Sequence, residues 1–174
     1  DRYQRAREEL WMTGLAYHCT CSRTQWDSFT GDSCPSDCRH RNVAFEPNRT
    51  ATRVHLDDLP DPIIWRRDDL PAYHLTSVVD DHDGLINLVV RGEDLESATN
   101  VQRFISKALP GNTFHEALVV HHPLVTSKGR KLSKSAGARS SPLPCSEDVR
   151  AAVSEVAAKY SASAQAVLCR SFED

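Results

Sequence analysis

The sequence has no long apolar run, and this absence argues against a membrane protein. Its 174 residues contain no stretch that approaches the roughly 18 consecutive apolar residues of a membrane-spanning helix. No secretory signal is apparent. Hydrophobic content of 40% and charged content of 26% are ordinary for a globular domain. We therefore expect a protein of the reducing cytoplasm with one sizeable core, or with one core and a small appended module.

The sequence also lacks an excess of positive charge. Its formal net charge of -3 argues against a generally basic nucleic-acid-binding protein. RNA binding through a local patch stays open, because basic residues are clustered in two places. The larger cluster comprises Lys128, Arg130, Lys131, Lys134 and Arg139, and the smaller one is the pair Arg66 and Arg67.

Internal repeats are absent, and the apolar periodicity instead predicts alternating strands and helices. We expect helices at 2–16, 72–81, 97–109 and 146–169, and strands at 54–56, 63–65, 85–90 and 117–120. The run 85–90 is apolar and β-branched throughout, which is typical of a strand buried on both faces. This order predicts an α/β fold with an open sheet, in which ligands bind outside the carboxyl ends of the strands.

Four of the six cysteines lie within twenty residues of one another. Cys19-x-Cys21 is followed, after twelve residues, by Cys34-x3-Cys38. Two close thiolate pairs joined by a loop suit the tetrahedral coordination of Zn²⁺. The alternatives are two local disulfides or inert core thiols, but cysteines two positions apart cannot easily pair and the cytoplasm disfavours disulfides. We predict that all four cysteines bind one zinc ion.

Four thiolates would leave zinc no open coordination position, so we expect a structural ion. His18 and His40 flank the cysteines and are spare candidates for ligands. Cys145 and Cys169 lie outside the cluster, and we assign them no role. The peptide loops around the zinc could present side chains to RNA.

A second chemical signal is the loop 127–138. It sets Lys131 and Lys134 among small hydroxyl residues, between Gly129 and Gly137. Such a loop is cationic and rich in hydrogen-bond donors, which suits binding of a nucleoside triphosphate. The alternative is a solvated surface loop, because short lysine-serine runs are common on surfaces.

The segment 131–135 resembles the KMSKS loop of class I aminoacyl-tRNA synthetases, with leucine in place of methionine. Further segments resemble consecutive blocks of the glutamyl-tRNA synthetase catalytic domain, and they occur in the same order: 65–75, 78–81, 90–95 and 121–124. With the first helix and the cysteine knuckle, the resemblance runs from about residue 2 to about residue 138.

Within that superfamily the sequence most resembles the glutamyl-queuosine tRNA(Asp) synthetases, short paralogues without an anticodon-binding domain. One reason is that the cysteine cluster ends in Cys38-Arg39. Another is that only 36 residues follow Ala138, too few for helical anticodon domains. One departure is visible: these paralogues commonly have tyrosine as the third zinc ligand, where this chain has Cys34. We expect Cys34 to strengthen the zinc site.

The resemblance implies part of a Rossmann-type catalytic domain with an inserted zinc-binding subdomain. It divides the sequence into four parts. These are a helix leading from an N-terminal half (1–16), the zinc-binding insertion (17–52), the second half of the catalytic domain with the KMSKS-like loop (53–138), and a helical tail of unknown role (139–174).

The resemblance also implies a function: ATP-dependent activation of L-glutamate and its transfer to the queuosine base of tRNA(Asp). ATP would be a substrate with Mg²⁺, and Zn²⁺ would be structural. Tyr73 and Arg91 match the positions that hold glutamate, Lys134 matches the lysine that contacts ATP, and Lys131 would support it. Read without the resemblance, Tyr73 could be a core aromatic on a helix face.

Arg91, read the same way, could form a salt bridge to Glu93 or Asp94. The pair Asp80-Asp81 invites an acid-base interpretation, but a carboxylate attacking a phosphate is already a nucleophile. We therefore expect these aspartates to be structural.

One element of such synthetases is missing: no HIGH-type histidine motif occurs, and His121-His122 is on the wrong strand to replace it. The resemblance places the motif before the first helix. We expect a fragment, one part of a split enzyme, or a degenerate relative, and we expect an uncovered apolar face that favours association. Two alternative functions remain: a non-catalytic zinc-containing RNA- or partner-binding module, and a piece of a glutamyl-tRNA synthetase proper.

Overall fold

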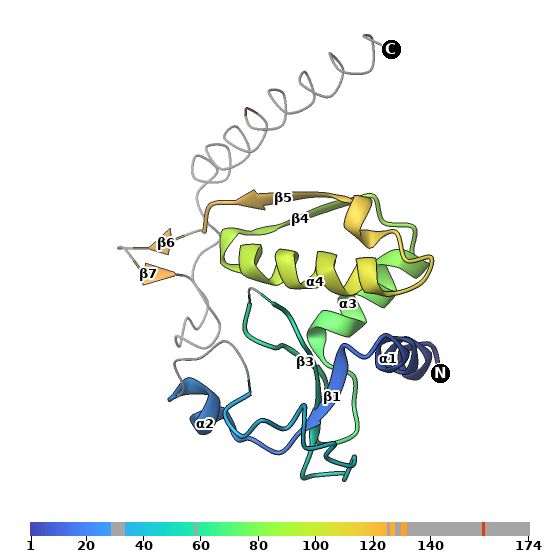
Figure 1. Cartoon of the computed structure of the whole chain (residues 1–174). Coiled ribbons are helices and arrows are strands. Elements are labelled where there is room, and N and C mark those ends of the chain that lie inside the picture. Colours follow the sequence, from blue (N-terminus) through green and yellow to red (C-terminus); the bar gives the residue numbers. More distant parts are fainter. Residues whose placement is uncertain (29–33, 58, 125, 128–129, 132–157, 159–174) are drawn as a thin grey trace. The chain divides into compact units, whose positions relative to one another are not determined.

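A computed structural model describes residues 1–28, 34–57, 59–124, 126–127, 130–131 and 158 (Figure 1). The chain forms two compact units. The first comprises Asp1–Asn87 and Ser97–Ala117, and the second comprises Leu88–Glu96 and Leu118–Asp174. Within the residues that the model describes, no helix combines the length and apolarity needed to cross a membrane.

The first unit is built on a three-stranded antiparallel sheet with the order β1-β2-β3. Its strands are β1 (Ala16–Cys19), β2 (Ala51–Val54) and β3 (Ile63–Trp65). In the register of β1 and β2, Ala16 lies opposite Val54 and Cys19 opposite Ala51. The strand predicted at 63–65 is confirmed, whereas β2 begins earlier than the predicted 54–56 and β1 was not predicted.

Helix α1 (Arg2–Met12) ends well before residue 16, so its predicted extent was wrong. The reason is Gly14, whose φ of +75° is a left-handed conformation that glycine adopts without steric cost. The chain turns there and enters β1, which places the cysteine knuckle at the end of a strand rather than in an irregular segment.

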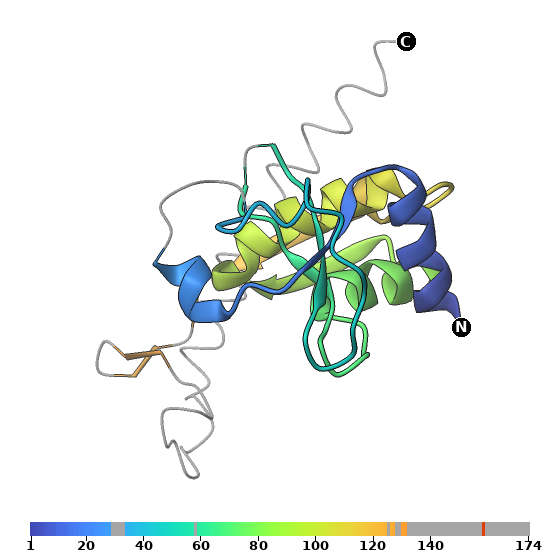
Figure 2. The same cartoon turned by 60° about the horizontal axis from the view of Figure 1, so that its bottom comes forward.

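Helix α1 packs beside α3 (Tyr73–Asp83), which in turn contacts β3 (Figure 1, Figure 2). The inward face of α3 is the predicted one: Leu75, Val78 and Val79 are buried. Burial of each such side chain stabilises the fold by about 1.5–3 kcal/mol. The predicted helix at 72–81 is therefore confirmed, with a slightly later end.

Ion pairs join the exposed sides of these two helices. The Arg2 guanidinium lies 2.6 Å from an Asp80 carboxylate oxygen and 2.8 Å from one of Asp83. The Tyr3 hydroxyl also donates to Asp80, over 2.7 Å. Asp80 is thus occupied with helix packing, as expected for a structural aspartate.

Helix α4 (Glu96–Ala108) is tied to the rest of the first unit by a buried side chain, Asn112. Its Oδ1 accepts hydrogen bonds from the Ser106 hydroxyl (2.6 Å) and from the backbone N–H of Phe114 (3.1 Å). Its Nδ2 donates to the carbonyl of Val78 in α3 (3.3 Å). Phe114 opens the short 3-10 helix η2 (Phe114–Glu116) and is buried.

The second unit contains a parallel pair of strands, β4 (Leu88–Gly92) and β5 (Leu118–His122). Along the chain α4 connects them, so the β-α-β order of an α/β fold is confirmed. The strand predicted at 85–90 begins later, because Leu85 adopts a left-handed φ of +53°. Burial on both faces was wrong: Leu88, Val90 and Leu118 are each about half exposed. The described residues leave the shared face of these alternate side chains open.

Two very short strands follow, β6 (Thr126–Ser127) and β7 (Arg130–Lys131), and they pair antiparallel. The KMSKS-like loop therefore begins in a hairpin. Lys134 and the helix predicted at 146–169 lie outside the described residues, except for Ala158, which is helical.

Candidate metal centre and substrate site

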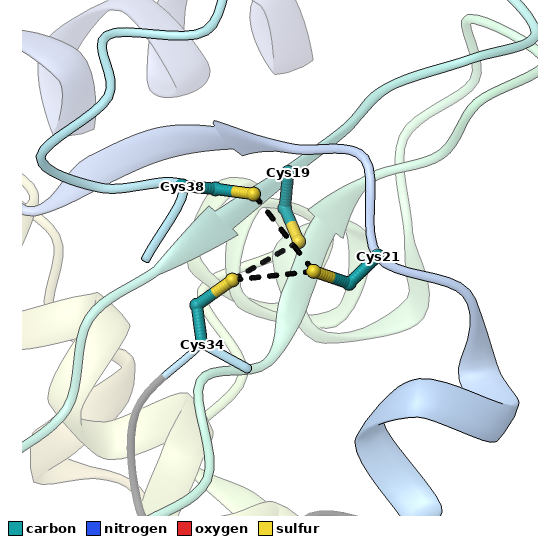
Figure 3. Close-up of side chains that lie close together, drawn as sticks. All are labelled: Cys19, Cys21, Cys34 and Cys38. Carbon is teal, nitrogen blue, oxygen red and sulfur yellow. Dashed lines mark hydrogen bonds between the residues drawn. The ribbon is translucent and has the colours of Figure 1, made fainter. Parts of the chain in front are cut away.

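The four predicted cysteines come together in the first unit (Figure 3). Cys19 is the last residue of β1, and Cys21 follows it at the turn into the short helix α2 (Arg23–Asp27). Cys34 and Cys38 approach from the returning segment. All four are buried, with exposed fractions of 6% or less.

The sulfur atoms fit tetrahedral zinc. All four ligand atoms lie within 4.8 Å of one another. The Sγ atom of Cys34 is 3.7 Å from that of Cys19 and 3.5 Å from that of Cys21, and Cys21 and Cys38 are 3.8 Å apart. A tetrahedron with zinc–sulfur bonds of about 2.3 Å has edges of about 3.8 Å. Three of the six sulfur–sulfur separations thus equal or come close to this edge, and all six stay within 4.8 Å, so the four thiols could hold a zinc ion.

The alternative of local disulfides is excluded for this cluster. The four residues are free cysteines, and their sulfur atoms are separated by far more than the 2.03–2.05 Å of a disulfide bond. The convergence of four thiols from two separate segments on one point favours metal binding over the interpretation as inert core thiols.

Burial raises the pKa of the Cys19 and Cys34 thiols, because a thiolate is poorly solvated there. Cys38 differs. Burial also raises its pKa, but hydrogen bonds from the backbone and hydroxyl of Thr20 and from neighbouring thiols outweigh this and lower the pKa to about 7.

Arg67 braces the knuckle, a role that the sequence did not reveal. Its guanidinium donates to the backbone carbonyls of Thr20 (3.0 Å) and Cys21 (2.7 Å). Its neighbour Arg66 is hydrogen-bonded to Asp68. The smaller basic patch predicted at Arg66-Arg67 is therefore largely occupied by internal contacts.

Trp26, on α2, packs against the cysteine cluster. A capping box formed by Ser22 and Gln25 begins this helix directly after Cys21. The Arg53 guanidinium lies 4.0 Å from the centroid of the Trp26 ring. Burial raises the pKa of the Cys19 thiol; the backbone of Cys21, then Trp26 and Arg53, offset this only in part. A lone tryptophan and a strand arginine gave no signal of this role in the sequence.

A buried carboxylate supports the sheet beside the knuckle. Asp61 accepts hydrogen bonds from the Tyr17 hydroxyl (2.6 Å) and from the backbone N–H of Leu56 (3.0 Å). The Arg53 guanidinium donates to the backbone carbonyl of Asp61 (2.5 Å). Burial and the neighbouring Asp61 raise the pKa of Tyr17, which holds the phenol protonated as the donor.

The two spare histidines do not join the metal cluster. His18 Nδ1 lies 3.1 Å from the Thr52 hydroxyl, and its ring stacks on Trp11 with centroids 4.4 Å apart. Burial, and secondarily Arg7, lower the pKa of His18. His40 Nδ1 lies 2.6 Å from a carboxylate oxygen of Asp37.

Of the residues predicted to hold glutamate, Tyr73 belongs to the first unit and Arg91 to the second. Tyr73 is the first residue of α3 and is 49% exposed, so the interpretation as a core aromatic was wrong. Its ring lies 5.5 Å from that of His74. Arg91 lies in β4, directly opposite His121 of β5.

The carboxyl ends of β4 and β5 lie at one edge of the parallel pair, with Gly92 opposite His122. Glu93, just after β4, accepts a hydrogen bond from the backbone N–H of Leu124 (3.3 Å). A side chain at position 92 would come within 3.0 Å of Leu124, so glycine permits this close approach. The contact holds Leu124 close to the end of β4.

A family model described as the catalytic domain of class I tRNA synthetases (E and Q) matches residues 41–156. A glutamyl-Q tRNA(Asp) synthetase of Pseudomonas syringae pv. syringae (strain B728a) is 33% identical over 168 residues, which cover 84% of this chain and 54% of that protein. One of Synechococcus sp. (strain ATCC 27144 / PCC 6301 / SAUG 1402/1) is 35% identical over 164 residues, covering 77% and 53%.

Among solved structures, the crystal structure of glutamate-tRNA synthetase from Elizabethkingia anophelis matches with a TM-score of 0.55 and 20% identity. The match covers 79% of this chain and 36% of that one, and it concerns the fold. The chain spans about half the length of the curated relatives it matches.

Proposed function

This chain belongs to the class I tRNA synthetase family of the E and Q type, and we propose that it serves the ATP-dependent activation of L-glutamate and its transfer to the queuosine base of tRNA(Asp). In this proposal it supplies the glutamate-binding, KMSKS-like and zinc-knuckle parts. The observation that carries the proposal is its identity of 33–35% to glutamyl-Q tRNA(Asp) synthetases over most of its own length.

Glutamate binding is assigned to Tyr73 and Arg91. The guanidinium of Arg91 suits a carboxylate because its planar donors match the two oxygens. The half-exposed phenol of Tyr73 supplies a directional hydrogen bond.

ATP is assigned to Lys134, with Lys131 in support. In the activation step, a glutamate carboxylate oxygen forms a bond to the α-phosphorus while the bond to pyrophosphate breaks. The carboxylate is already deprotonated, so the step needs positioning and neutralisation of phosphate charge rather than a general base. The ion pairs of Asp80 with α1 agree with this, because they leave it a structural role.

Zinc is assigned to Cys19, Cys21, Cys34 and Cys38. When bound, it would cross-link the end of β1 to the returning segment 34–38. A closed set of four thiolates has no open position for a substrate, so its contribution is to the fold of the knuckle.

The test is glutamate-dependent exchange of pyrophosphate into ATP, measured on the zinc-loaded chain without tRNA. Exchange by the wild-type chain would mean that a complete active site forms, and Lys134→Ala should then lower it at least about 100-fold, the range for removing one preorganised charge-stabilising group. Lys107→Ala, an exposed lysine of α4, is the matched control and should retain the activity.

The outcomes separate the candidate functions. A folded, zinc-loaded chain that catalyses no exchange would mean that the activity belongs to a larger enzyme or needs a partner, and that this chain alone is at most a binding module. Exchange followed by transfer only to tRNA(Asp) that carries queuosine supports the proposal. Transfer to the acceptor end of a glutamate tRNA would instead indicate a glutamyl-tRNA synthetase proper.

A further inference from the structure

A cavity lies beside the zinc knuckle, on the side of Cys38. It has a volume of about 740 Å³ and is formed by the end of α1, strand β1 and the segment 38–45. Its size falls within the range of small-molecule sites, roughly 300–1,000 Å³. The side chains that matter here are Trp11, His18, Arg39, His40, Asn42 and Phe45.

One wall of this cavity is aromatic. The rings of Trp11 and His18 stack with their centroids 4.4 Å apart and their planes at 29°. Phe45 continues the group, with its ring centroid 5.3 Å from that of His18. Trp11 is nevertheless 44% exposed, so a large indole surface stays open to a further flat ring. Such a surface is a stacking platform for a nucleobase.

The same cavity is also lined by a positively charged side chain, Arg39, which directly follows Cys38. Its side chain is half-buried, and it forms no hydrogen bond or ion pair with any other residue in the described part of the chain. A fixed guanidinium that lacks an internal partner is suited to bind a phosphate oxygen. His40 differs, because Asp37 already occupies its Nδ1 at 2.6 Å.

The Trp11 cavity differs in charge from a neighbouring cavity, which lies on the side of Cys21. That cavity has a similar volume, about 730 Å³, but Asp27, Asp61 and Asp68 line it together with its arginines. No carboxylate is among the described residues that line the Trp11 cavity. An anionic ligand with a flat ring therefore fits the Trp11 cavity better.

We propose that this cavity binds one nucleotide of a single-stranded RNA segment, with the base stacked on Trp11 and the phosphate paired with Arg39. The choice of RNA rests on the proposed function, in which a tRNA is the acceptor. A free mononucleotide shares the same chemistry, so the experiment must tell the two sources apart.

The experiment uses the whole zinc-loaded chain and a short fluorescein-labelled single-stranded RNA, with binding followed by fluorescence anisotropy. Trp11→Ala should raise the Kd roughly 5- to 100-fold, the range for loss of one base-aromatic stack, and Trp11→Phe should restore most of the affinity. Arg39→Ala should weaken binding and lower the slope of log K against log salt by about one, as expected for one lost phosphate contact.

Matched controls are Met12→Ala and Arg41→Ala. Met12 is an exposed apolar neighbour of Trp11, and Arg41 is an exposed arginine of the same segment; neither lines the cavity. Both variants should bind within about twofold of the wild type. Zinc content and thermal melting of Trp11→Ala show whether the knuckle stays folded, and Trp11→Phe keeps the test valid if it does not.

Three results would overturn the inference. The first is a wild-type chain that folds and binds zinc but not RNA, which would point to a protein ligand. The second is an Arg41→Ala effect as large as that of Arg39→Ala, which would mean diffuse attraction. The third is AMP binding as tightly as RNA, which would identify a free-mononucleotide site. None of these involves glutamate-dependent exchange, so a failure of the proposed function is detected separately.

Discussion

At the residue scale, the buried carboxylate of Asp61 stabilises the fold beside the knuckle through several hydrogen bonds. Asp61 is 3% exposed, and its carboxylate accepts from Tyr17 and from the backbone of Leu56. Hydrogen bonds to a charged group contribute more than neutral ones, and a buried donor left without an acceptor costs about 1–3 kcal/mol. Nδ1 of the His55 ring also lies 3.2 Å from this carboxylate, so Asp61 collects three polar groups beside the knuckle.

Asp61→Ala should lower the free energy of unfolding by about 3 kcal/mol, because the Tyr17 hydroxyl and the Leu56 N–H would both lose their acceptor. Urea denaturation of the zinc-loaded chain measures this. The control is Asp57→Ala: Asp57 is exposed, and its carboxylate lies 3.3 Å from Nε2 of His55, so its effect should stay within about 0.5 kcal/mol. Equal effects of the two substitutions would contradict a structural role for Asp61.

The four cysteines of the candidate metal site could be predicted from the sequence, whereas the residues that support them could not. Cysteines are rare, and two pairs at short spacing carry the information locally. Arg67 reaches the knuckle from 46 residues away and Asp61 reaches Tyr17 from 44. Arginine and aspartate are common surface residues, so only the folded chain distinguishes these two from the others.

At the scale of elements, Asn112 joins three pieces of backbone: the end of α4, the chain at Phe114 and the carbonyl of Val78 in α3. Its three hydrogen bonds are buried, and no regular strand or helix pairing would replace them. The Asn112 amide thus links α3, α4 and the chain at Phe114 through hydrogen bonds to groups that are buried away from water.

Asn112→Ala should destabilise the first unit by about 2–3 kcal/mol, because the Phe114 N–H would lose its acceptor and the Ser106 hydroxyl one of its partners, His115 remaining as another. Asn100→Ala serves as the control: Asn100 is exposed on α4, and alanine favours the helix there. Chemical denaturation should rank the variants in this order. An Asn112→Ala protein as stable as Asn100→Ala would show that the amide does not link the helices.

Helices and strands were predicted unequally, for physical reasons. The amphipathic face of α3 is explicit in the spacing of Leu75, Val78 and Val79. β1 was missed because its four residues, read from Ala16 to Cys19, show no alternation of polar and apolar character. β4 was judged buried from its composition, but composition cannot say whether another element covers its face.

At the scale of the whole molecule, the predicted metal centre and the predicted nucleotide-binding loop belong to different compact units. The four cysteines and Tyr73 lie in the first, and Arg91 and the lysine segment in the second. A metal that is structural should therefore act on the stability of one unit and leave the other largely unaffected. This separates the role of zinc from the chemistry of the lysine loop.

Removing zinc tests that separation. Structural zinc commonly supplies about 10–16 kcal/mol of apparent binding free energy, and each kcal/mol moves the Tm of a chain of this size by about 2–4 °C. A chelator should therefore lower the Tm by more than about 10 °C. In hydrogen exchange, the amides of β1 and β2 should lose protection, whereas those of β4 and β5 should keep theirs. Zn²⁺ should restore the protection and Mg²⁺ should not, because thiolates select the softer ion. An unchanged Tm after proven removal of zinc would mean that the packed thiols alone hold the knuckle together.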